Sequence, residues 1–188
     1  MTRIIGGSAG GRQLRTPPGE RTRPTADRVR EALFSSLESS LGGLSGLAFL
    51  DLYAGSGAVG LEAASRGAEQ VTLVESHQPT ARLIQANART IGVQAEVIAA
   101  SVPTVLARPA AHAFDVAFID PPYDRDIDDD LVLLQRNGWL AVHALVVVER
   151  SARSVEPSWP EQWVLQRSKK YGETVLWYVS AAPTQQPN

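Results

Sequence analysis

From residue 47 onward, short apolar segments alternate with amphipathic ones, and short connections rich in glycine, proline and polar residues separate them. This alternation constrains the fold, because strands joined through helices pair in parallel and need helices on both faces of the sheet. The apolar segments predict strands at 47–53, 70–75, 95–100, 114–120 and 144–149. The segments between them predict helices at 58–66, 79–91 and 126–136, and a short helix from Pro103. We therefore expect an α/β fold with a mostly parallel sheet.

Both ends of the chain depart from this alternation. Residues 25–37 predict a helix with Thr25 as its N-cap. After residue 160, the segments WVLQRSKKYG and ETVLWYVS predict an antiparallel hairpin that turns around Gly172 on the sheet edge. We expect three parts: a basic extension made of a hairpin and a helix over 1–40, the main domain over 41–180, and a disordered tail over 181–188.

Composition narrows the class of protein. The chain has 188 residues, enough for one domain with a substantial core. With no cysteine and three histidines, disulfides and thiolate metal sites are excluded, and a metal site is not expected. No apolar run approaches the ~18 residues that a membrane helix needs, and the N-terminal MTRIIGGSAGG has no secretory signal pattern. We expect a cytoplasmic protein without a membrane partner.

The charge is distributed unevenly. Net charge is −2, yet the first 30 residues hold seven arginines against two acidic residues. A basic N-terminal arm on an acidic body favours contact with a polyanion such as a nucleic acid. A solvated terminus without a partner is the alternative.

A glycine-rich turn follows the first strand of the alternating region, in LDLYAGSGAVGLEA. Gly55, Gly57 and Gly60 form G-x-G-x-x-G, and Glu75 ends the next strand 20 residues after Gly55. This pattern is typical of a site where a nucleotide approaches the backbone and its ribose hydroxyls meet a carboxylate. NAD, FAD and S-adenosylmethionine all fit it. Asp51 favours S-adenosylmethionine, because a carboxylate suits the ammonium of a methionine moiety better than a pyrophosphate.

The segment FIDPPYDRD, at residues 118–126, places an acid, two prolines and a tyrosine after the fourth strand. Parallel strands end at one sheet edge, so Asp120 should lie near the glycine turn. The prolines fix the backbone and remove two N–H donors, which leaves the Asp120 carboxylate and the Pro121 carbonyl as acceptors for an exocyclic amine. The Tyr123 ring offers a stacking surface worth ~1–3 kcal/mol. Methyl transfer to the amine of a base is the chemistry predicted; an ordinary loop start is the alternative.

Four segments of the chain closely resemble the RsmD family. They are Asp-Pro-Pro-Tyr, RIIGGSAGGRQLRTPPG, TRPTADRVREALFSSL and LDLYAGSGAVGLEAASRGA. These Class I S-adenosylmethionine-dependent methyltransferases methylate the N2 amine of a guanine in 16S ribosomal RNA. The resemblance runs from Arg3 to Tyr123, and more loosely through KKYGETVLWY. It implies a Rossmann-like, seven-stranded sheet and S-adenosyl-L-methionine as cofactor. It also implies 16S ribosomal RNA as partner, within the small ribosomal subunit or its assembly intermediate. We expect a monomer.

The resemblance also suggests roles for individual residues. Those expected to bind the cofactor are Asp51, Tyr53, Gly55, Ser56, Gly57, Glu75, Ser76, Ser101, Val102 and Asp120. Those expected at the catalytic amine and base site are Asp120, Pro121, Pro122 and Tyr123. Those expected to contact RNA are Arg3, Arg12, Arg15, Arg21, Arg23, Arg28, Arg30, Lys169 and Lys170.

Some of these assignments have alternatives. Many such enzymes bind the cofactor's adenine through an acidic or amide side chain after the third strand. In this sequence, the Ser101 hydroxyl and the Val102 N–H are expected to take that role. Asp27 could pair with an arginine within the fold, and Lys169 and Lys170 could belong to a solvated hairpin turn.

Three other functions compete with ribosomal RNA methylation. An adenine-N6 methyltransferase acting on RNA or DNA would use the same Asp-Pro-Pro-Tyr, although the arginine-rich arm argues against it. An NAD(P)-dependent oxidoreductase would leave Asp51 and Asp-Pro-Pro-Tyr unexplained. A non-catalytic RNA-binding module would have no need of Asp120 and Tyr123.

Overall fold

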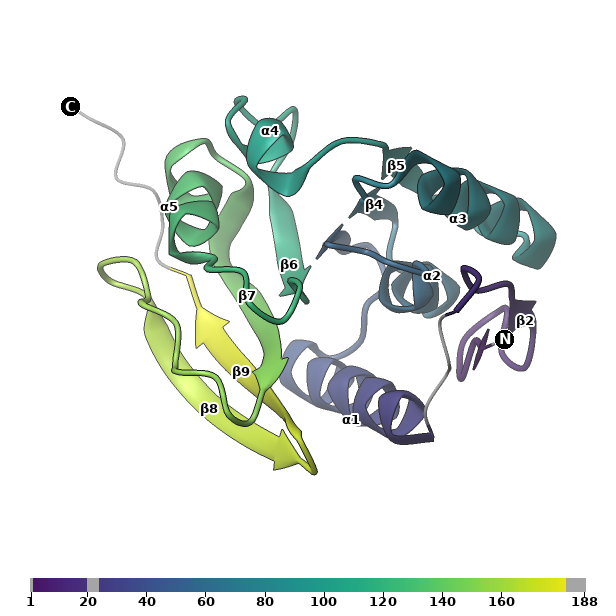
Figure 1. Cartoon of the computed structure of the whole chain (residues 1–188), viewed down its shortest axis with the longest axis horizontal. Coiled ribbons are helices and arrows are strands. Elements are labelled where there is room, and N and C mark those ends of the chain that lie inside the picture. Colours follow the sequence, from purple (N-terminus) through teal and green to yellow (C-terminus); the bar gives the residue numbers. More distant parts are fainter. Residues whose placement is uncertain (1, 20–23, 182–188) are drawn as a thin grey trace.

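The structure is a computed structural model that describes residues 2–19 and 24–181. A seven-stranded sheet forms its centre, in the order β5-β4-β3-β6-β7-β9-β8 (Figure 1). The strands are β3 (Ala48–Leu52), β4 (Gln70–Val74), β5 (Glu96–Ile98), β6 (Phe114–Ile119), β7 (Leu140–Ser151), β8 (Val164–Tyr171) and β9 (Thr174–Ser180). The helices are α1 (Pro24–Leu41), α2 (Ala58–Ser65), α3 (Gln78–Ile91), α4 (Val102–Leu106) and α5 (Asp128–Arg136).

The pairing of the strands confirms the predicted sheet. The five strands from β3 to β7 run parallel, and β8 and β9 form an antiparallel hairpin whose β9 pairs with β7. Every residue of β3 is buried, as expected for a central strand of a sheet covered on both faces.

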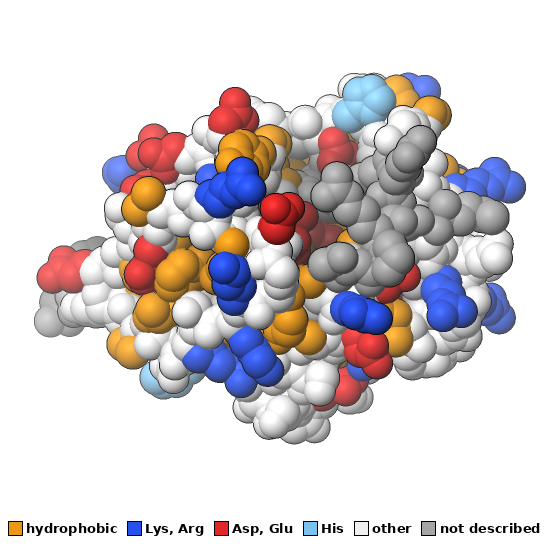
Figure 2. Space-filling model, turned by 60° about the horizontal axis from the view of Figure 1, so that its bottom comes forward, with side chains coloured by type: hydrophobic (Ala, Val, Ile, Leu, Met, Phe, Trp, Pro, Cys, Tyr) orange, Lys and Arg blue, Asp and Glu red, His pale blue; other side chains and the backbone are white. Residues whose placement is uncertain are grey.

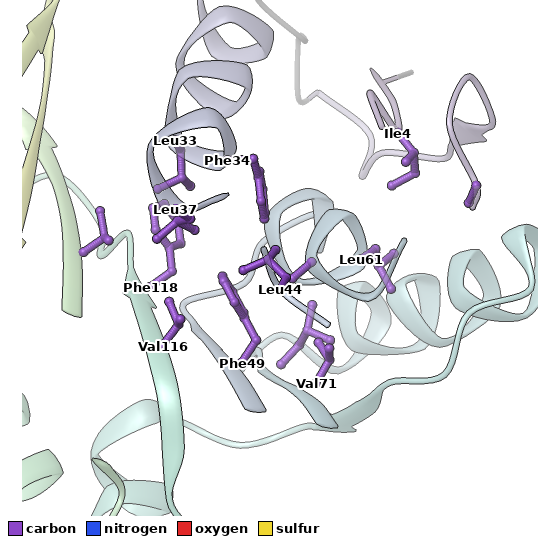
Figure 3. Packing of buried hydrophobic residues seen from close by; sticks show 14 of the residues in the cluster. Ile4, Leu33, Phe34, Leu37, Leu44, Phe49, Leu61, Val71, Val116 and Phe118 are labelled. Atoms are coloured by element: carbon purple, nitrogen blue, oxygen red, sulfur yellow. The ribbon is translucent and has the colours of Figure 1, made fainter. Parts of the chain in front are cut away.

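Two apolar cores lie on the two faces of the sheet. On one face, α1, α2 and α3 pack against the sheet, and Figure 3 shows Leu33 and Leu37 of α1 lying against Phe118. On the other face, α4 and α5 pack against side chains that include Leu50 and Ile119. Phe49 and Leu50 are neighbours in β3 but belong to different cores, because successive side chains of a strand point to opposite faces.

Two predicted boundaries were wrong. The helix predicted at 25–37 begins at Pro24 and runs to Leu41, so Thr25 lies inside it and is not its N-cap. It ends where Gly42, at φ 73°, donates a hydrogen bond to the Glu38 carbonyl. The strand predicted at 144–149 begins four residues earlier, at Leu140, because it continues through an irregularity at His143, where φ is 60°.

The N-terminal segment forms a short antiparallel pair, β1 (Thr2–Arg3) with β2 (Gln13–Leu14), held on α2 by Glu62. The Glu62 carboxylate is fully buried and accepts hydrogen bonds from the N–H groups of Ile5 and Gly6, both at 2.8 Å. It also accepts one from Arg66 Nε at 2.8 Å, and Arg66 reaches the partly exposed Glu38 at 3.0 Å. One buried carboxylate therefore ties the start of the chain to α2.

Arg30 completes this network from α1. Its guanidinium donates to the Arg3 carbonyl at 2.6 Å, pairs with Asp27 at 3.3 Å, and lies 3.8 Å from Glu62. Burial lowers the pKa of Arg30, although the two nearby acids oppose this shift. The alternative in which Asp27 pairs with an arginine is thus confirmed. The prediction that Arg30 contacts RNA was wrong, because its side chain is only 7% exposed and serves the fold.

The extension shares the core of the main domain, since Ile4 and Leu14 are buried with the α1 and α2 side chains. Its division from the domain at residue 40 stays a prediction. At the other end, Ala181 is buried and bonds to the Ala144 carbonyl, whereas 182–188 lie outside the described residues. No helix within the described ranges is both long and apolar enough to cross a membrane.

We predict that Glu62→Ala lowers the free energy of unfolding by about 3–5 kcal/mol, because it leaves buried guanidinium groups without their partner. Glu38→Ala is the matched control at the partly exposed end of the same network, and should cost less than about 1 kcal/mol. Urea unfolding monitored by circular dichroism measures both. Equal losses in the two variants would show that the Glu62 carboxylate is not the anchor of the N-terminal segment.

Candidate active site

Three parallel strands, β3, β4 and β6, end in register at one edge of the sheet, and β7 passes beside them and continues to Ser151. Leu52 of β3 pairs with Val74 of β4 and with Ile119 of β6, which in turn pairs with Val148 of β7. The residues in the next row are Tyr53, Glu75, Asp120 and Glu149. The structure therefore brings Asp120 and the glycine turn to the same edge, as the strand order predicted.

The glycine turn is built by close contacts. The Gly55 N–H donates to Glu75 Oε2 at 2.9 Å, and the other oxygen of Glu75 accepts from the His77 N–H at 2.7 Å. Gly57, at φ 79°, precedes α2, and a Cβ there would lie 2.8 Å from the Ile84 side chain. A Cβ at Gly60 would lie 2.5 Å from Leu73. Gly57 thus lets the turn lie close to α3, and Gly60 lets α2 pack onto β4, while the turn holds the Glu75 carboxylate in place.

Asp51 lies directly below the turn and is 1% exposed. Its Oδ2 accepts a hydrogen bond from the Gly60 N–H at 2.8 Å. Burial raises the pKa of Asp51 to about 8; the bond to Gly60 opposes this shift, and the nearby carboxylates of Asp120 and Glu75 add to it. A positive charge brought next to this carboxylate would stabilise its ionised form.

A cavity of about 630 Å³ opens beside the glycine turn. Its lining residues are Tyr53, Gly55, Val74, Glu75, Ser76, Ser101, Val102, Pro103, Asp120, Pro121, Pro122 and Arg125. Ser101 is the N-cap of α4, and its hydroxyl accepts from the Thr104 N–H. The Val102 N–H is in the first turn of α4, where backbone donors have no partner within the helix. The cavity thus contains most of the residues expected to bind the cofactor.

A second cavity, of about 220 Å³, lies between α1 and the strand ends. The strands contribute Asp51, Phe118, Asp120 and Glu149, the turn contributes Ser56, and α1 contributes Ala26, Val29 and Leu33. Both cavities are lined by Tyr53, Gly55 and Asp120, so they meet at Asp120. On the face shown in Figure 2, acidic side chains lie near the middle, with Lys and Arg side chains around them.

Asp-Pro-Pro-Tyr presents the expected groups. Asp120 and Pro122 are exposed and Pro121 is buried. The Tyr123 ring is 70% exposed, which leaves it accessible to a base that stacks on it. The Tyr123 carbonyl accepts a hydrogen bond from Arg150 of β7 at 3.4 Å, and the Arg125 N–H donates to the Pro122 carbonyl at 3.0 Å.

A cluster of polar side chains that the sequence did not reveal anchors this loop. The Tyr53 hydroxyl bonds to the Asp130 carboxylate of α5 and accepts from Arg125 Nε at 2.5 Å. Arg125 also lies 3.7 Å from Asp130, and its guanidinium stacks over the Tyr53 ring. Burial raises the pKa of both Tyr53 and Asp130. The sequence contains only a weak indication of this cluster. Acidic residues in the first turn of α5 are equally explained by their favourable interaction with the helix dipole.

A second residue missed is Glu149, which follows the apolar run of β7 at the edge where Asp120 follows that of β6. Burial raises the pKa of Glu149 to about 8, and the carboxylates of Asp120 and Asp51 add to this shift. The sequence did contain a signal, since Glu149 is an acid at the predicted end of a parallel strand.

The residues expected to contact RNA differ in their exposure and in whether the structure describes them. Arg3, Arg12, Arg15 and Arg28 are exposed, although Arg12 also donates to the Ile91 carbonyl at 3.0 Å. Arg21 and Arg23 lie outside the described residues. Lys169 and Lys170 are exposed on β8 itself rather than in the hairpin turn.

Comparison with known proteins identifies the family. The sequence profile of a family described as Conserved hypothetical protein 95 matches residues 2–180. Ribosomal RNA small subunit methyltransferase D of Escherichia coli K12 is 38% identical over 173 residues, which cover 91% of this chain and 85% of that protein. The chain belongs to the RsmD family. The Haemophilus influenzae member of the RsmD family is also 38% identical, over 90% of this chain and 89% of its own.

Solved structures agree with this membership. The yhhF protein of Escherichia coli superposes with a TM-score of 0.84 at 36% identity, covering 97% of this chain and 98% of its own. Magnesium protoporphyrin IX methyltransferase from Synechocystis PCC 6803 is only 11% identical, with a TM-score of 0.66 over 87% of each chain. This second likeness shows the fold alone, which is the Rossmann-like Class I methyltransferase fold. Within the described residues, no three His, Cys, Asp or Glu side chains are grouped to hold a metal ion.

We predict that Glu149→Gln stabilises the unliganded protein at high pH. Because folding raises the pKa of Glu149 from 4.5 to about 8, the folded state binds more protons than the unfolded state between these values, and stability falls as pH rises through this range. The glutamine variant lacks this loss, so it should be more stable than the wild type by about 1–3 kcal/mol near pH 8, with little difference near pH 4.

Urea unfolding at several pH values measures this effect. Glu173→Gln is the control, since this carboxylate is 83% exposed on the neighbouring hairpin. A Glu149→Gln protein that follows the wild-type pH dependence would show that the cleft does not hold a destabilised carboxylate.

Proposed function

We propose that this protein transfers a methyl group from S-adenosylmethionine to the N2 amine of a guanine in 16S ribosomal RNA. The observation that carries this proposal is the meeting of two cavities at Asp120, one suited to a nucleoside and the other to an amino base. Membership of the RsmD family supports the reaction and the class of RNA.

The residues present fit S-adenosylmethionine. Glu75 can still accept hydrogen bonds from ribose hydroxyls. Each of its carboxylate oxygens accepts one backbone N–H and has a further lone pair for a second donor. The Val102 N–H, with Ser101 beside it, would meet the adenine, and Asp51 would face the ammonium group. Besides Asp27, which pairs with Arg30, four carboxylates line the cavities, and they suit a ligand that carries both an ammonium and a sulfonium. When bound, this cofactor supplies an electrophilic methyl group.

Asp120 and Pro121 would position the nucleophile. The Asp120 carboxylate and the Pro121 carbonyl accept the two hydrogens of the amine, which turns its lone pair toward the methyl carbon. The new N–C bond forms as the S–C bond breaks, and the electron pair of the S–C bond stays on the sulfur. The nitrogen then loses one proton to Asp120 or to water. Most of the acceleration comes from this alignment and from the electrostatics of the cleft.

The RNA would be held outside the cavities. Tyr123 stacks on the target base, and the exposed arginines of the extension, with Lys169 and Lys170, neutralise phosphates. The substrate would be presented within the small ribosomal subunit or its assembly intermediate, to a monomeric enzyme in the cytoplasm.

We predict that Asp120→Ala lowers methyl transfer by at least about 100-fold, because it removes an acceptor of the amine. Its dissociation constant for S-adenosylmethionine should change by less than about threefold, since the other cofactor contacts stay. Tritium transfer to small subunits from a strain lacking this protein measures the rate, and calorimetry measures the affinity. Asp124→Ala, in the same exposed loop, is the control. Normal turnover by Asp120→Ala would refute the assigned role.

We predict that replacing Arg12 and Arg15 by Gln weakens RNA association and reduces its salt dependence. Removing one arginine–phosphate pair lowers the slope of log K against log salt by about 1, so the slope of the double variant should fall by about 1–2. Fluorescence anisotropy with labelled 16S ribosomal RNA measures the slope. Arg108 and Arg136, on the α4 and α5 side, provide a control pair of arginines. The arm is not the electrostatic contact if both pairs change the slope equally, or neither does.

A further inference from the structure

Glu149 occupies the position beside Asp120. Ile119 pairs with Val148, so Asp120 and Glu149 are the next residues of two neighbouring parallel strands, which lie about 4.8 Å apart. Both line the cavity beneath α1, and both line a further cavity with Pro121 and Tyr123. A base whose amine is held by Asp120 therefore has the Glu149 carboxylate next to the same edge of its ring.

The Glu149 carboxylate has no hydrogen-bond or ion-pair partner within residues 2–19 and 24–181. Among the described residues, no N–H or O–H group donates a hydrogen bond to it, and its electrostatic neighbours are the like-charged Asp120 and Asp51. The α1 wall of the cavity presents Ala26, Val29 and Leu33 near it, while Asp27 and Arg30 pair with each other.

The other buried acids have donors. Asp51 accepts from Gly60, Glu62 from two backbone N–H groups, and Asp130 from Tyr53. Glu149 is only half-buried and faces the cavities, yet no described group donates to its carboxylate, so a structural role does not explain it. A ligand that supplies a donor does explain it.

The edge of guanine supplies this donor. In guanine the N2 amine is followed along the ring by the N1–H, which is also a donor. In adenine and cytosine the ring nitrogen next to the amine is an acceptor. A carboxylate beside Asp120 therefore complements guanine and repels the other two amino bases, because two acceptors would face each other.

We infer that Glu149 accepts a hydrogen bond from the N1–H of the target guanine and selects guanine over other amino bases. This inference rests on the proposed function, and it assigns to one residue a specificity that Asp-Pro-Pro-Tyr alone does not provide. A site built to accept a hydrogen bond rejects an analogue without the donor strongly, so the preference should be at least about 10-fold.

The test uses 16S ribosomal RNA assembled into small-subunit particles, with either guanine or 2-aminopurine at the methylated position. 2-Aminopurine keeps the amine on C2, but its N1 is an acceptor. The wild type should methylate guanine with a kcat/KM at least about 10-fold higher than 2-aminopurine. Glu149→Gln should bring the ratio to about 1 or below, because its amide N–H can donate to the N1 of 2-aminopurine.

The ratio of the two substrates does not depend on the amount of active enzyme, so partial loss of activity leaves the test intact. Glu149→Asp keeps the carboxylate and should keep a preference for guanine. Glu161→Gln should keep it too, since Glu161 is exposed and lines none of these cavities. A circular dichroism spectrum equal to that of the wild type verifies that each variant is folded.

Two failures can be told apart. A wild type that methylates guanine but does not discriminate against 2-aminopurine, or a Glu149→Gln ratio equal to that of the wild type, overturns the role of Glu149 alone. A wild type that methylates neither particle overturns the proposed function, and the inference fails with it.

Discussion

The register of β3, β6 and β7 places three carboxylates in one narrow cleft. The apolar rows formed by Leu52, Ile119 and Val148 must stay aligned to be buried, so the residues that follow them also lie in one row. Asp51, Asp120 and Glu149 are then forced into proximity, where each carboxylate disfavours the charge of the others. The unliganded cleft therefore has more hydrogen-bond acceptors than donors. A bound cation or N–H donor would stabilise the ionised carboxylates.

Two polar networks keep this cleft in shape from opposite sides. On the α5 side, Tyr53, Arg125 and Asp130 hold the loop that follows Asp-Pro-Pro-Tyr against the glycine turn. On the α1 side, Glu62 and Arg30 hold the N-terminal segment and the helix that walls the second cavity. Both networks are fixed by residues outside the reaction, and they reduce the rearrangement needed when substrates bind.

The sequence predicted the sheet well because the strands are continuous apolar runs and glycines separate them from the helices. It also located Asp120 and Glu75, since both end predicted strands at a common edge. It misjudged Arg30, because the charge of an arginine does not reveal whether a partner such as Glu62, 32 residues away, will bury it. The role of Glu149 was missed because its environment depends on Asp51 and Asp120, which come from other strands. Local sequence patterns predict helices, strands and turns. They do not predict which charged groups become buried or lie close together, because this depends on how the elements pack.

Under the proposed function, the N-terminal extension would link RNA binding to the chemistry of the site. Its exposed arginines suit phosphates, yet the same segment contributes Thr2, Thr16 and the α1 side chains to the wall of the base cavity. Arg30 explains how both roles coexist: by turning inward to the Arg3 carbonyl and toward Glu62, it fixes the segment that carries the outward-facing arginines. Phosphate contacts made by these arginines would therefore position the RNA relative to a rigid cavity wall rather than to a loose arm. Such coupling favours a bound RNA whose target base is already placed beneath α1, beside Asp120 and Glu149.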